Sequence, residues 1–161
     1  YEANGGFLLG SDITVDGRGL TALPTRDAML PILAALVASR KAGGLIALEA
    51  ALPARVTYSD RIQAFPPEDS RRLFAHLQNE DAAARDARLA GYFAGPHGGL
   101  AGVDLTDGIR MTMADGVVVH LRGSGNAPEL RCYTEAGDAA TAAAANAAAL
   151  RTVLEQVLAA A

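Results

Sequence analysis

Two Asp-Gly dipeptides, Asp107-Gly108 and Asp115-Gly116, constrain the fold of this 161-residue chain more than any other feature. Asp-Gly is favoured in tight hairpin turns because both residues tolerate a positive φ angle. Between the two dipeptides, apolar and polar side chains alternate over residues 109–113, which is typical of a strand with one buried face. The two turns therefore predict three antiparallel strands.

A fourth strand is expected after the last hairpin. The strand-like run 117–121 is interrupted by the loop Arg122 to Glu129 and resumes at 130–136, where Leu130 and Cys132 alternate with polar residues. These segments predict a four-stranded, largely antiparallel sheet.

Two helices are expected beside this sheet. A pair of prolines begins an apolar stripe over 67–79, and proline is tolerated in the first turn of a helix. The Ala-rich run from 139 continues into large apolar residues spaced three and four apart, which predicts one long helix to about 158. Fewer than two heptads carry large residues, so packing on the sheet is favoured over a coiled coil. The expected fold is α+β, with two helices on one face of the sheet.

The first third of the chain has a different organisation. Polar, turn-rich residues around 16–19 predict a loop, and a helix is expected from about Pro24 with Thr25 or Asp27 as its cap. A short helix over 45–52 ends at Pro53, and Arg55 to Ile62 is the next candidate strand. We place a domain boundary there, between residues 1–53 and 54–161. Residues 81–101 carry conflicting helix-forming and helix-breaking signals, so no element is assigned to them. Because the sequence begins inside loop-like residues, we interpret it as a fragment of a longer protein.

Composition excludes several classes of function. The net charge of −4 and the pI near 5.3 leave no basic field for nucleic acid or an anionic membrane. Cys132 is the only cysteine, which excludes a disulfide framework and fits a reducing cytoplasm. No apolar run is long enough to span a membrane and no leader is visible. His76, His97 and His120 lack ligand spacing, so no metal site is expected here.

The loop from Arg122 to Arg131 has the residue types of an anion site. Its glycines permit tight turns that point backbone N–H groups at one place, Ser124 and Asn126 add side-chain donors, and Arg122 offers a planar fork for phosphate oxygens. A simple glycine-containing connection between two strands fits the spacing equally well. A Walker loop is excluded because no Gly-Lys-Ser/Thr follows, and the glycines at 17 and 19 make a poor dinucleotide fingerprint.

The same loop resembles the phosphate-binding signature of the α-D-phosphohexomutase family, Arg-Pro-Ser-Gly-Thr-Glu-Pro followed two residues later by Arg, then Tyr and Glu. The matching positions are Arg122, Ser124, Gly125, Pro128, Arg131, Tyr133 and Glu135. The departures are Gly123 for Pro, Asn126 for Thr and Ala127 for Glu. With the Asp-Gly turns upstream, the resemblance covers residues 55–161. It implies that the substrate phosphate is held by Arg122, Gly123, Ser124, Gly125, Asn126 and Arg131.

The opening of the chain carries a second resemblance. Its first six residues are similar to the Gly-Glu-x-Ser-Gly-His sugar loop of the family's third domain, with Glu2 matching, Asn4 in place of Ser and Gly6 in place of His. The resemblance implies that Glu2 and Asn4 bind sugar hydroxyls. It also implies that residues 1–53 are the truncated C-terminal end of that α/β domain, and that 54–161 is the phosphate-binding domain.

For the whole enzyme, the resemblance implies interconversion of hexose 6-phosphate and hexose 1-phosphate, of mannose or glucose, through a bisphosphorylated sugar. The catalytic phosphoserine and the Mg²⁺ loop belong to upstream domains of the same chain, so we expect no catalytic residue, no cofactor and no turnover in this fragment. The alternative is a stand-alone anion-binding or protein-interaction module, in which the Ala-rich helix forms an interface.

Overall fold

The computed structural model describes residues 6–78 and 80–161. The chain divides into two compact units, Tyr1–Ala54 and Arg55–Ala161. Each unit is described by itself.

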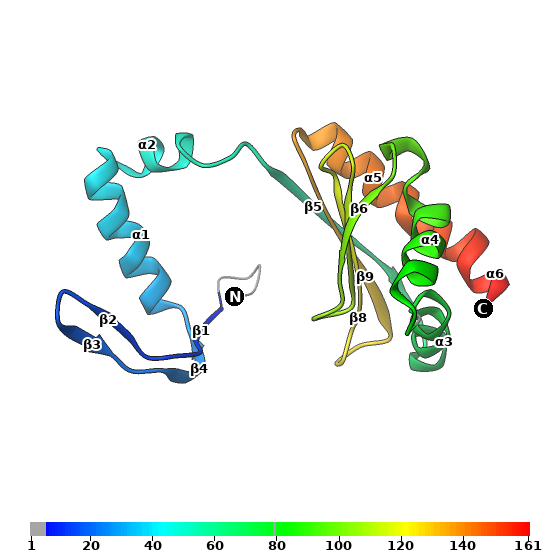
Figure 1. Ribbon diagram of the computed structural model, residues 1–161, viewed down its shortest axis with the longest axis horizontal. Coiled ribbons are helices and arrows are strands. Elements are labelled where there is room, and N and C mark those ends of the chain that lie inside the picture. Colours follow the sequence, from blue (N-terminus) through cyan, green and yellow to red (C-terminus); the bar gives the residue numbers. More distant parts are fainter. Residues whose placement is uncertain (1–5, 79) are drawn as a thin grey trace. The chain divides into compact units, whose positions relative to one another are not determined.

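Unit 1 consists of two small antiparallel sheets and two helices (Figure 1). Its elements are β1 (Phe7–Leu9), β2 (Ile13–Val15), β3 (Arg18–Leu20), β4 (Leu23–Asp27), α1 (Met29–Ala42) and α2 (Leu45–Ala50). β1 pairs with β4, and β2 pairs with β3. The described strands pair only antiparallel, so assigning this unit to an α/β domain stays a prediction.

The N-terminal elements differ from the sequence-based expectation at two places. Residues expected to form a loop instead form the β2–β3 hairpin, whose turn has positive φ angles of 51° at Asp16 and 73° at Gly17. The expected helix start at Pro24 is wrong, because residues 23–27 pair with β1. Asp27 does cap α1, since its carboxylate accepts hydrogen bonds from the amides of Met29 (2.7 Å) and Leu30 (3.2 Å).

Unit 1 buries almost nothing by itself. Among its described residues, only Gly6 and Ser39 are buried. Large apolar side chains of α1 are about half exposed: Met29, Ile32, Leu33, Leu36 and Val37. A helix with this much exposed apolar surface lacks the packing partner that normally stabilises it.

Unit 2 contains a five-stranded antiparallel sheet in the order β5-β9-β8-β7-β6. The strands are β5 (Val56–Gln63), β6 (Leu100–Asp104), β7 (Ile109–Met113), β8 (Val118–Gly123) and β9 (Glu129–Ala136). The expected count of four is therefore wrong. The additional strand is β5, which was expected as a strand but not counted in this sheet. It pairs with β9 along its whole length although more than sixty residues separate them, and no local turn signal could reveal that pairing.

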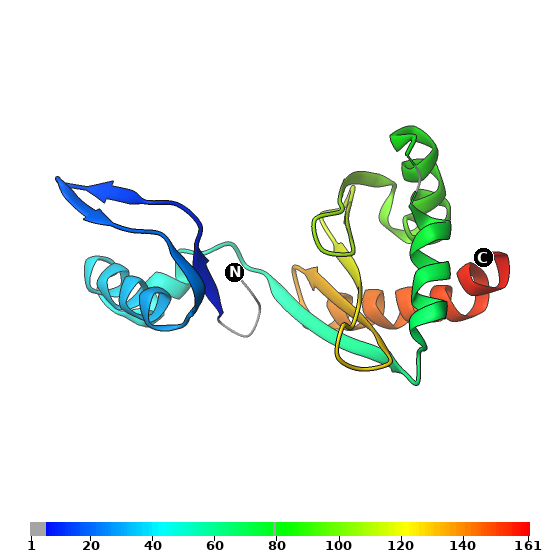
Figure 2. The ribbon, with the colours of Figure 1, turned by 90° about the horizontal axis from the view of Figure 1, so that it is seen from below.

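Helices cover one face of this sheet (Figures 1 and 2). They are α3 (Pro67–Leu77), α4 (Ala82–Phe93), and α5 (Ala139–Thr152), which continues through a π-helical turn (Val153–Val157) into α6 (Leu158–Ala160). The expected number of two is wrong because α4 forms in the segment with conflicting signals. Its first turn is capped by Asp81, whose carboxylate accepts from the amides of Ala83 and Ala84.

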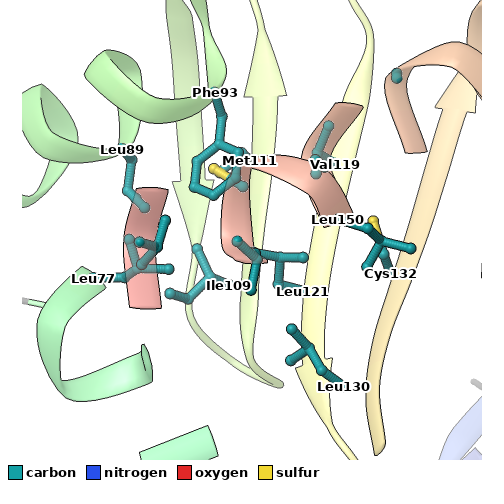
Figure 3. Close-up of a cluster of buried hydrophobic side chains, with 14 of the residues drawn as sticks. Leu77, Leu89, Phe93, Ile109, Met111, Val119, Leu121, Leu130, Cys132 and Leu150 are labelled. Atoms are coloured by element: carbon teal, nitrogen blue, oxygen red, sulfur yellow. The ribbon is translucent and has the colours of Figure 1, made fainter. Parts of the chain in front are cut away.

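The core of unit 2 lies between the helices and the inner face of the sheet (Figure 3). Alternate residues of β7 are fully buried, as the sequence predicts: Ile109, Met111 and Met113 are at most 1% exposed. The Ala-rich helix packs on this core, which confirms the prediction over the coiled-coil alternative; Leu150 and Val153 are buried while Leu154 is exposed.

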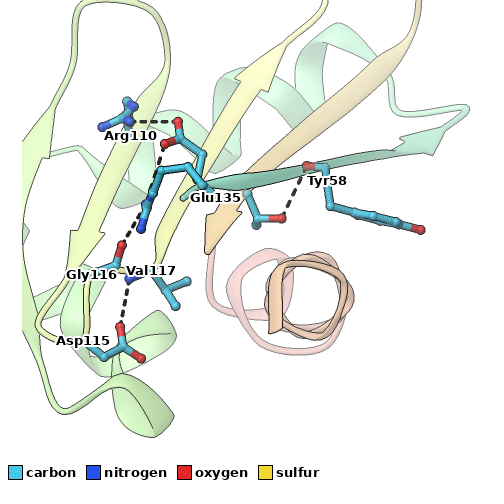
Figure 4. Close-up of polar contacts among 8 residues, drawn as sticks. Tyr58, Arg110, Asp115, Gly116, Val117 and Glu135 are labelled. Atoms are coloured by element: carbon cyan, nitrogen blue, oxygen red, sulfur yellow. Dashed lines mark hydrogen bonds and ion pairs between the residues drawn. The ribbon is translucent and has the colours of Figure 1, made fainter. Parts of the chain in front are cut away.

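The helix-free face of the sheet is polar. Arg110 of β7 donates to Glu135 of β9 over 2.9 Å, and Arg55 donates to the carbonyl of Gly116 (Figure 4). Both arginines therefore lie on the exposed sheet surface in contact with protein acceptors.

Candidate functional site

The loop after β8 is closed by short-range hydrogen bonds. The amide of Ser124 donates to the carbonyl of Glu129 (3.0 Å) and continues the β8–β9 ladder by one step. The Ser124 hydroxyl oxygen accepts from the amides of Asn126 (3.4 Å) and Ala127 (3.3 Å). Both distances are at the long end of the hydrogen-bond range. The loop therefore holds two backbone N–H groups around one oxygen, by bonds that a better acceptor can replace.

A cavity of about 390 Å³ opens beside this loop. One wall is the end of β8 and the loop, a second is the turn before β7, and a third is one side of α3. The lining residues are Ser70, Phe74, Gln78, Asp107, Gly108, Arg122, Gly123, Ser124 and Gly125. A volume of this size is within the range of roughly 300–1,000 Å³ that small-molecule sites occupy.

Arg122 is the cation of this cavity. Its Nε atom lies 3.1 Å from Oδ2 of Asp107, and the two side chains are 39% and 58% exposed. Within residues 6–78 and 80–161, the Arg122 side chain makes this ion pair and no side-chain hydrogen bond. Its remaining N–H groups are therefore available to an anionic ligand.

The turn that carries Asp107 is held close to β8. Gly108 has a φ of 83°, and a Cβ atom there would lie 2.2 Å from the carbonyl oxygen of Leu121. Only glycine fits both the angle and the contact. The Asp107 carbonyl oxygen also lies 2.5 Å from Nε2 of His120, whose ring centroid is 5.7 Å from that of Tyr133. His120 thus supports the turn that forms one wall of the cavity.

The two loop glycines serve different purposes, and neither has a positive φ. A Cβ atom on Gly123 would lie 2.8 Å from the hydroxyl oxygen of Ser70, so this glycine permits close contact with α3. A Cβ atom on Gly125 would meet nothing within 4 Å. No contact within the described chain requires glycine at position 125, which leaves open space beside the loop.

Arg131 lies next to Arg122 across the β8–β9 ladder, and Arg61 of β5 lies on its other side. Glu129 forms ion pairs with Arg131 and Arg61: its carboxylate oxygens lie 3.5 Å from Arg131 Nε and 3.4 Å from Arg61 Nε. A hydrogen bond with Tyr133 raises the pKa of Arg131, with Glu129 contributing in the same direction. The row of three arginines crosses β5, β9 and β8 and is paired with two carboxylates, Glu129 and Asp107, so this part of the sheet surface carries a small excess of positive charge.

The structure brings together four of the six residues expected at the phosphate: Arg122, Gly123, Ser124 and Gly125 line one cavity. Asn126 is exposed and Arg131 is adjacent on the sheet, but neither lines the cavity. The expected sugar-binding residues Glu2 and Asn4 lie outside the described residues. Sequence reasoning missed Ser70, Phe74 and Gln78, although their spacing of four along a predicted helix places them on one side of it.

No group of three or more His, Cys, Asp or Glu residues in the described part of the chain could hold a metal ion. The acidic residue nearest the loop, Asp107, is already paired with Arg122. Among the residues that the structure describes, no helix is both long enough and apolar enough to cross a membrane.

Comparison with known proteins relates this chain to one family of enzymes. Residues 74–152 match the family model for the phosphoglucomutase/phosphomannomutase C-terminal domain. A phosphomannomutase of Sinorhizobium fredii is 44% identical over 142 residues, which cover 86% of this chain and 28% of the relative. A phosphomannomutase of Salmonella muenchen is 46% identical over 136 residues, which cover 84% of this chain and 27% of the relative.

This chain belongs to the phosphoglucomutase/phosphomannomutase family, and residues 74–152 correspond to the C-terminal domain of that family. It spans a little over a quarter of the length of the two relatives.

Proposed function

We propose that the loop Arg122–Asn126, with Arg131 beside it, binds the phosphate group of a hexose phosphate. One observation carries this proposal: Arg122, Ser124 and Gly125 line a single cavity at the end of β8, in a chain of the phosphohexomutase family. As part of the full-length enzyme, the site serves the interconversion of hexose 6-phosphate and hexose 1-phosphate through a bisphosphorylated sugar.

The loop offers a phosphate three kinds of donor. Arg122 supplies a planar guanidinium, which suits two phosphate oxygens at once. The amides of Asn126 and Ala127 now point at the Ser124 hydroxyl oxygen. A phosphate oxygen carries more negative charge and is a stronger acceptor, so rotation of the Ser124 side chain lets the ligand accept from those amides and from the hydroxyl itself.

A fixed clamp of this kind suits a mutase. The phosphate that does not react is anchored, while the other end of the sugar is positioned for phosphoryl transfer. Because the loop recognises only phosphate, it can hold the sugar in either of its two orientations. Arg131 adds positive charge next to Arg122 and lengthens the range over which the anion is attracted.

Catalysis requires parts of the enzyme outside this chain. The described residues present no donor set that fits Mg²⁺. Following the family resemblance, we assign the metal and the phosphorylated serine to upstream domains of the same protein. Magnesium there would neutralise phosphate charge during transfer. This chain alone therefore binds but does not turn over.

Unit 1 is best explained as the end of the sugar-recognition domain. The exposed apolar residues of α1 need a packing partner, and the upstream part of the same domain supplies one. In this arrangement Glu2 and Asn4 bind sugar hydroxyls. The relatives' names favour mannose phosphate as a substrate, and glucose phosphate remains the second candidate. Family membership favours this function over a stand-alone anion-binding module.

The test is made in the full-length enzyme with Arg122→Ala and, as a matched control, Arg151→Ala on the exposed side of α5. Loss of a charge-assisted hydrogen bond should raise KM for mannose 6-phosphate by about 10- to 100-fold, equivalent to roughly 1.5–3 kcal/mol. The control should leave KM unchanged. An unchanged KM in Arg122→Ala would remove this residue from the phosphate site.

A further inference from the structure

One wall of the cavity comes from α3, and no part of the proposed phosphate site accounts for it. Ser70, Phe74 and Gln78 line the cavity. They are spaced four residues apart, so they lie above one another on one side of the helix and its C-terminal cap. They face the loop across the same space that Arg122 borders.

Ser70 lies against the loop itself. Its hydroxyl oxygen would be 2.8 Å from a Cβ atom on Gly123, and Cε2 of Phe74 would be 3.5 Å from the same atom. Within the described chain, the Ser70 hydroxyl makes no side-chain hydrogen bond although the residue is half-buried. A hydroxyl with free hydrogen-bonding capacity and an aromatic ring are thus placed immediately beside the expected phosphate.

The two sides of the cavity differ in charge. The strand side carries the ion pair of Arg122 with Asp107, and the helix side contributes a hydroxyl, an amide and an aromatic ring, all neutral. A neutral wall offers no charge to attract a second phosphate. It suits the uncharged part of a phosphosugar, whose hydroxyls hydrogen-bond to serine and glutamine and whose C–H surface packs on an aromatic ring.

We propose that α3 is a second recognition surface, in which Ser70 and Gln78 bind hydroxyls of the sugar ring whose phosphate the loop holds, with Phe74 against the ring. This inference rests on the proposed phosphate site. It makes Ser70 and Gln78 specificity-determining residues, because they contact the part of the ligand in which one hexose differs from another.

The test compares two ligands on the 161-residue chain, inorganic phosphate and mannose 6-phosphate, with amide shifts of residues 123–126 measured by NMR. The variants are Ser70→Ala and Gln78→Ala. The control is Ser59→Ala, an exposed serine of β5 that does not line the cavity. Spectra of all variants verify that the fold is kept.

Loss of one neutral hydrogen bond should weaken mannose 6-phosphate binding by about 2- to 10-fold in each cavity variant, equivalent to roughly 0.5–1.5 kcal/mol. Inorganic phosphate should bind all variants equally, and Ser59→Ala should change neither affinity. Equal mannose 6-phosphate affinity in wild type and both variants would overturn the inference, as would equal weakening for both ligands. If neither ligand shifts the loop amides of the wild type, the phosphate site itself fails.

Discussion

The Nε atom of Arg122 lies 3.1 Å from Oδ2 of Asp107, so a cation of the proposed phosphate site already has an anionic partner. Both side chains are more than a third exposed, and ion pairs of this kind contribute little to stability. A phosphate that reaches Arg122 therefore meets a carboxylate that competes for the same guanidinium group.

Replacing Asp107 should strengthen phosphate binding. Asp107→Asn removes the competing charge and should lower the Kd for inorganic phosphate by about two- to fivefold, equivalent to roughly 0.5–1 kcal/mol. Titration followed by NMR measures this, with Asp86→Asn as the control, because Asp86 pairs with Arg85 on α4 and does not line the cavity. Weaker binding in Asp107→Asn would instead identify Asp107 as the residue that orients Arg122.

The close contact between the turn and β8 should make Gly108 costly to replace. Gly108→Ala combines a φ of 83° with a Cβ atom 2.2 Å from the Leu121 carbonyl oxygen. In Gly116→Ala the φ of 85° is equally unfavourable, but the nearest atom to the new Cβ atom is 4.0 Å away, so only the backbone angle destabilises this variant. The free energy of unfolding in urea should fall by about 1–2 kcal/mol for Gly116→Ala and by at least about 3 kcal/mol for Gly108→Ala. Equal losses would show that the backbone contact is not rigid.

The same two Asp-Gly turns show how much of the fold could be predicted. Each lies in a short connection between two antiparallel neighbours, with a positive φ at the glycine, so the pairing of β6, β7 and β8 follows from local sequence. β5 pairs with β9 across the length of the domain, and no local pattern encodes a pairing of such separation. Helix α4 was missed because Gly91 counts against a helix locally, whereas burial of Leu89 and Phe93 favours one.

The part of the site that comes from one continuous segment could be predicted from the sequence. Arg122, Ser124 and Gly125 are adjacent in sequence, and donor chemistry alone marks them as an anion loop. Ser70, Gln78 and Asp107 reach the same cavity from other elements, and each is an ordinary polar residue in its local context. The role of Gly123 was not predictable from the loop alone, because this glycine is needed for close contact with α3, which comes from another part of the chain.

Gly125 should matter for the ligand and not for the fold. Its Cβ position is open and its φ is ordinary, so Gly125→Ala should change the free energy of unfolding by less than about 1 kcal/mol. A methyl group beside the bound phosphate should still weaken binding by roughly fivefold or more, about 1 kcal/mol. Gly137→Ala, also in open space, is the matched control and should leave affinity unchanged. Unaltered affinity in Gly125→Ala would place the ligand away from this residue.

Cys132 should report on unfolding through its ionisation. Burial raises the pKa of the Cys132 thiol to about 12, with Asp60 adding to the shift. The unfolded thiol ionises near pH 8.5, so the unfolded state loses its proton first and stability falls as pH rises from about 8.5 towards 12. In urea titrations, the free energy of unfolding of the wild type should fall with pH by up to about 1.4 kcal/mol per pH unit more than that of Cys132→Ala. Identical pH dependence in the two proteins would contradict burial of the thiol.

Phosphate binding by the loop is tested by titration of the 161-residue chain with mannose 6-phosphate, followed at the backbone amides of Gly123, Ser124, Gly125 and Asn126. We expect saturable shifts at these amides and at the Nε–H of Arg122, with no comparable change on the helix-free face around Arg110 and Glu135. Binding that shifts other residues and leaves this loop unchanged would contradict this expectation.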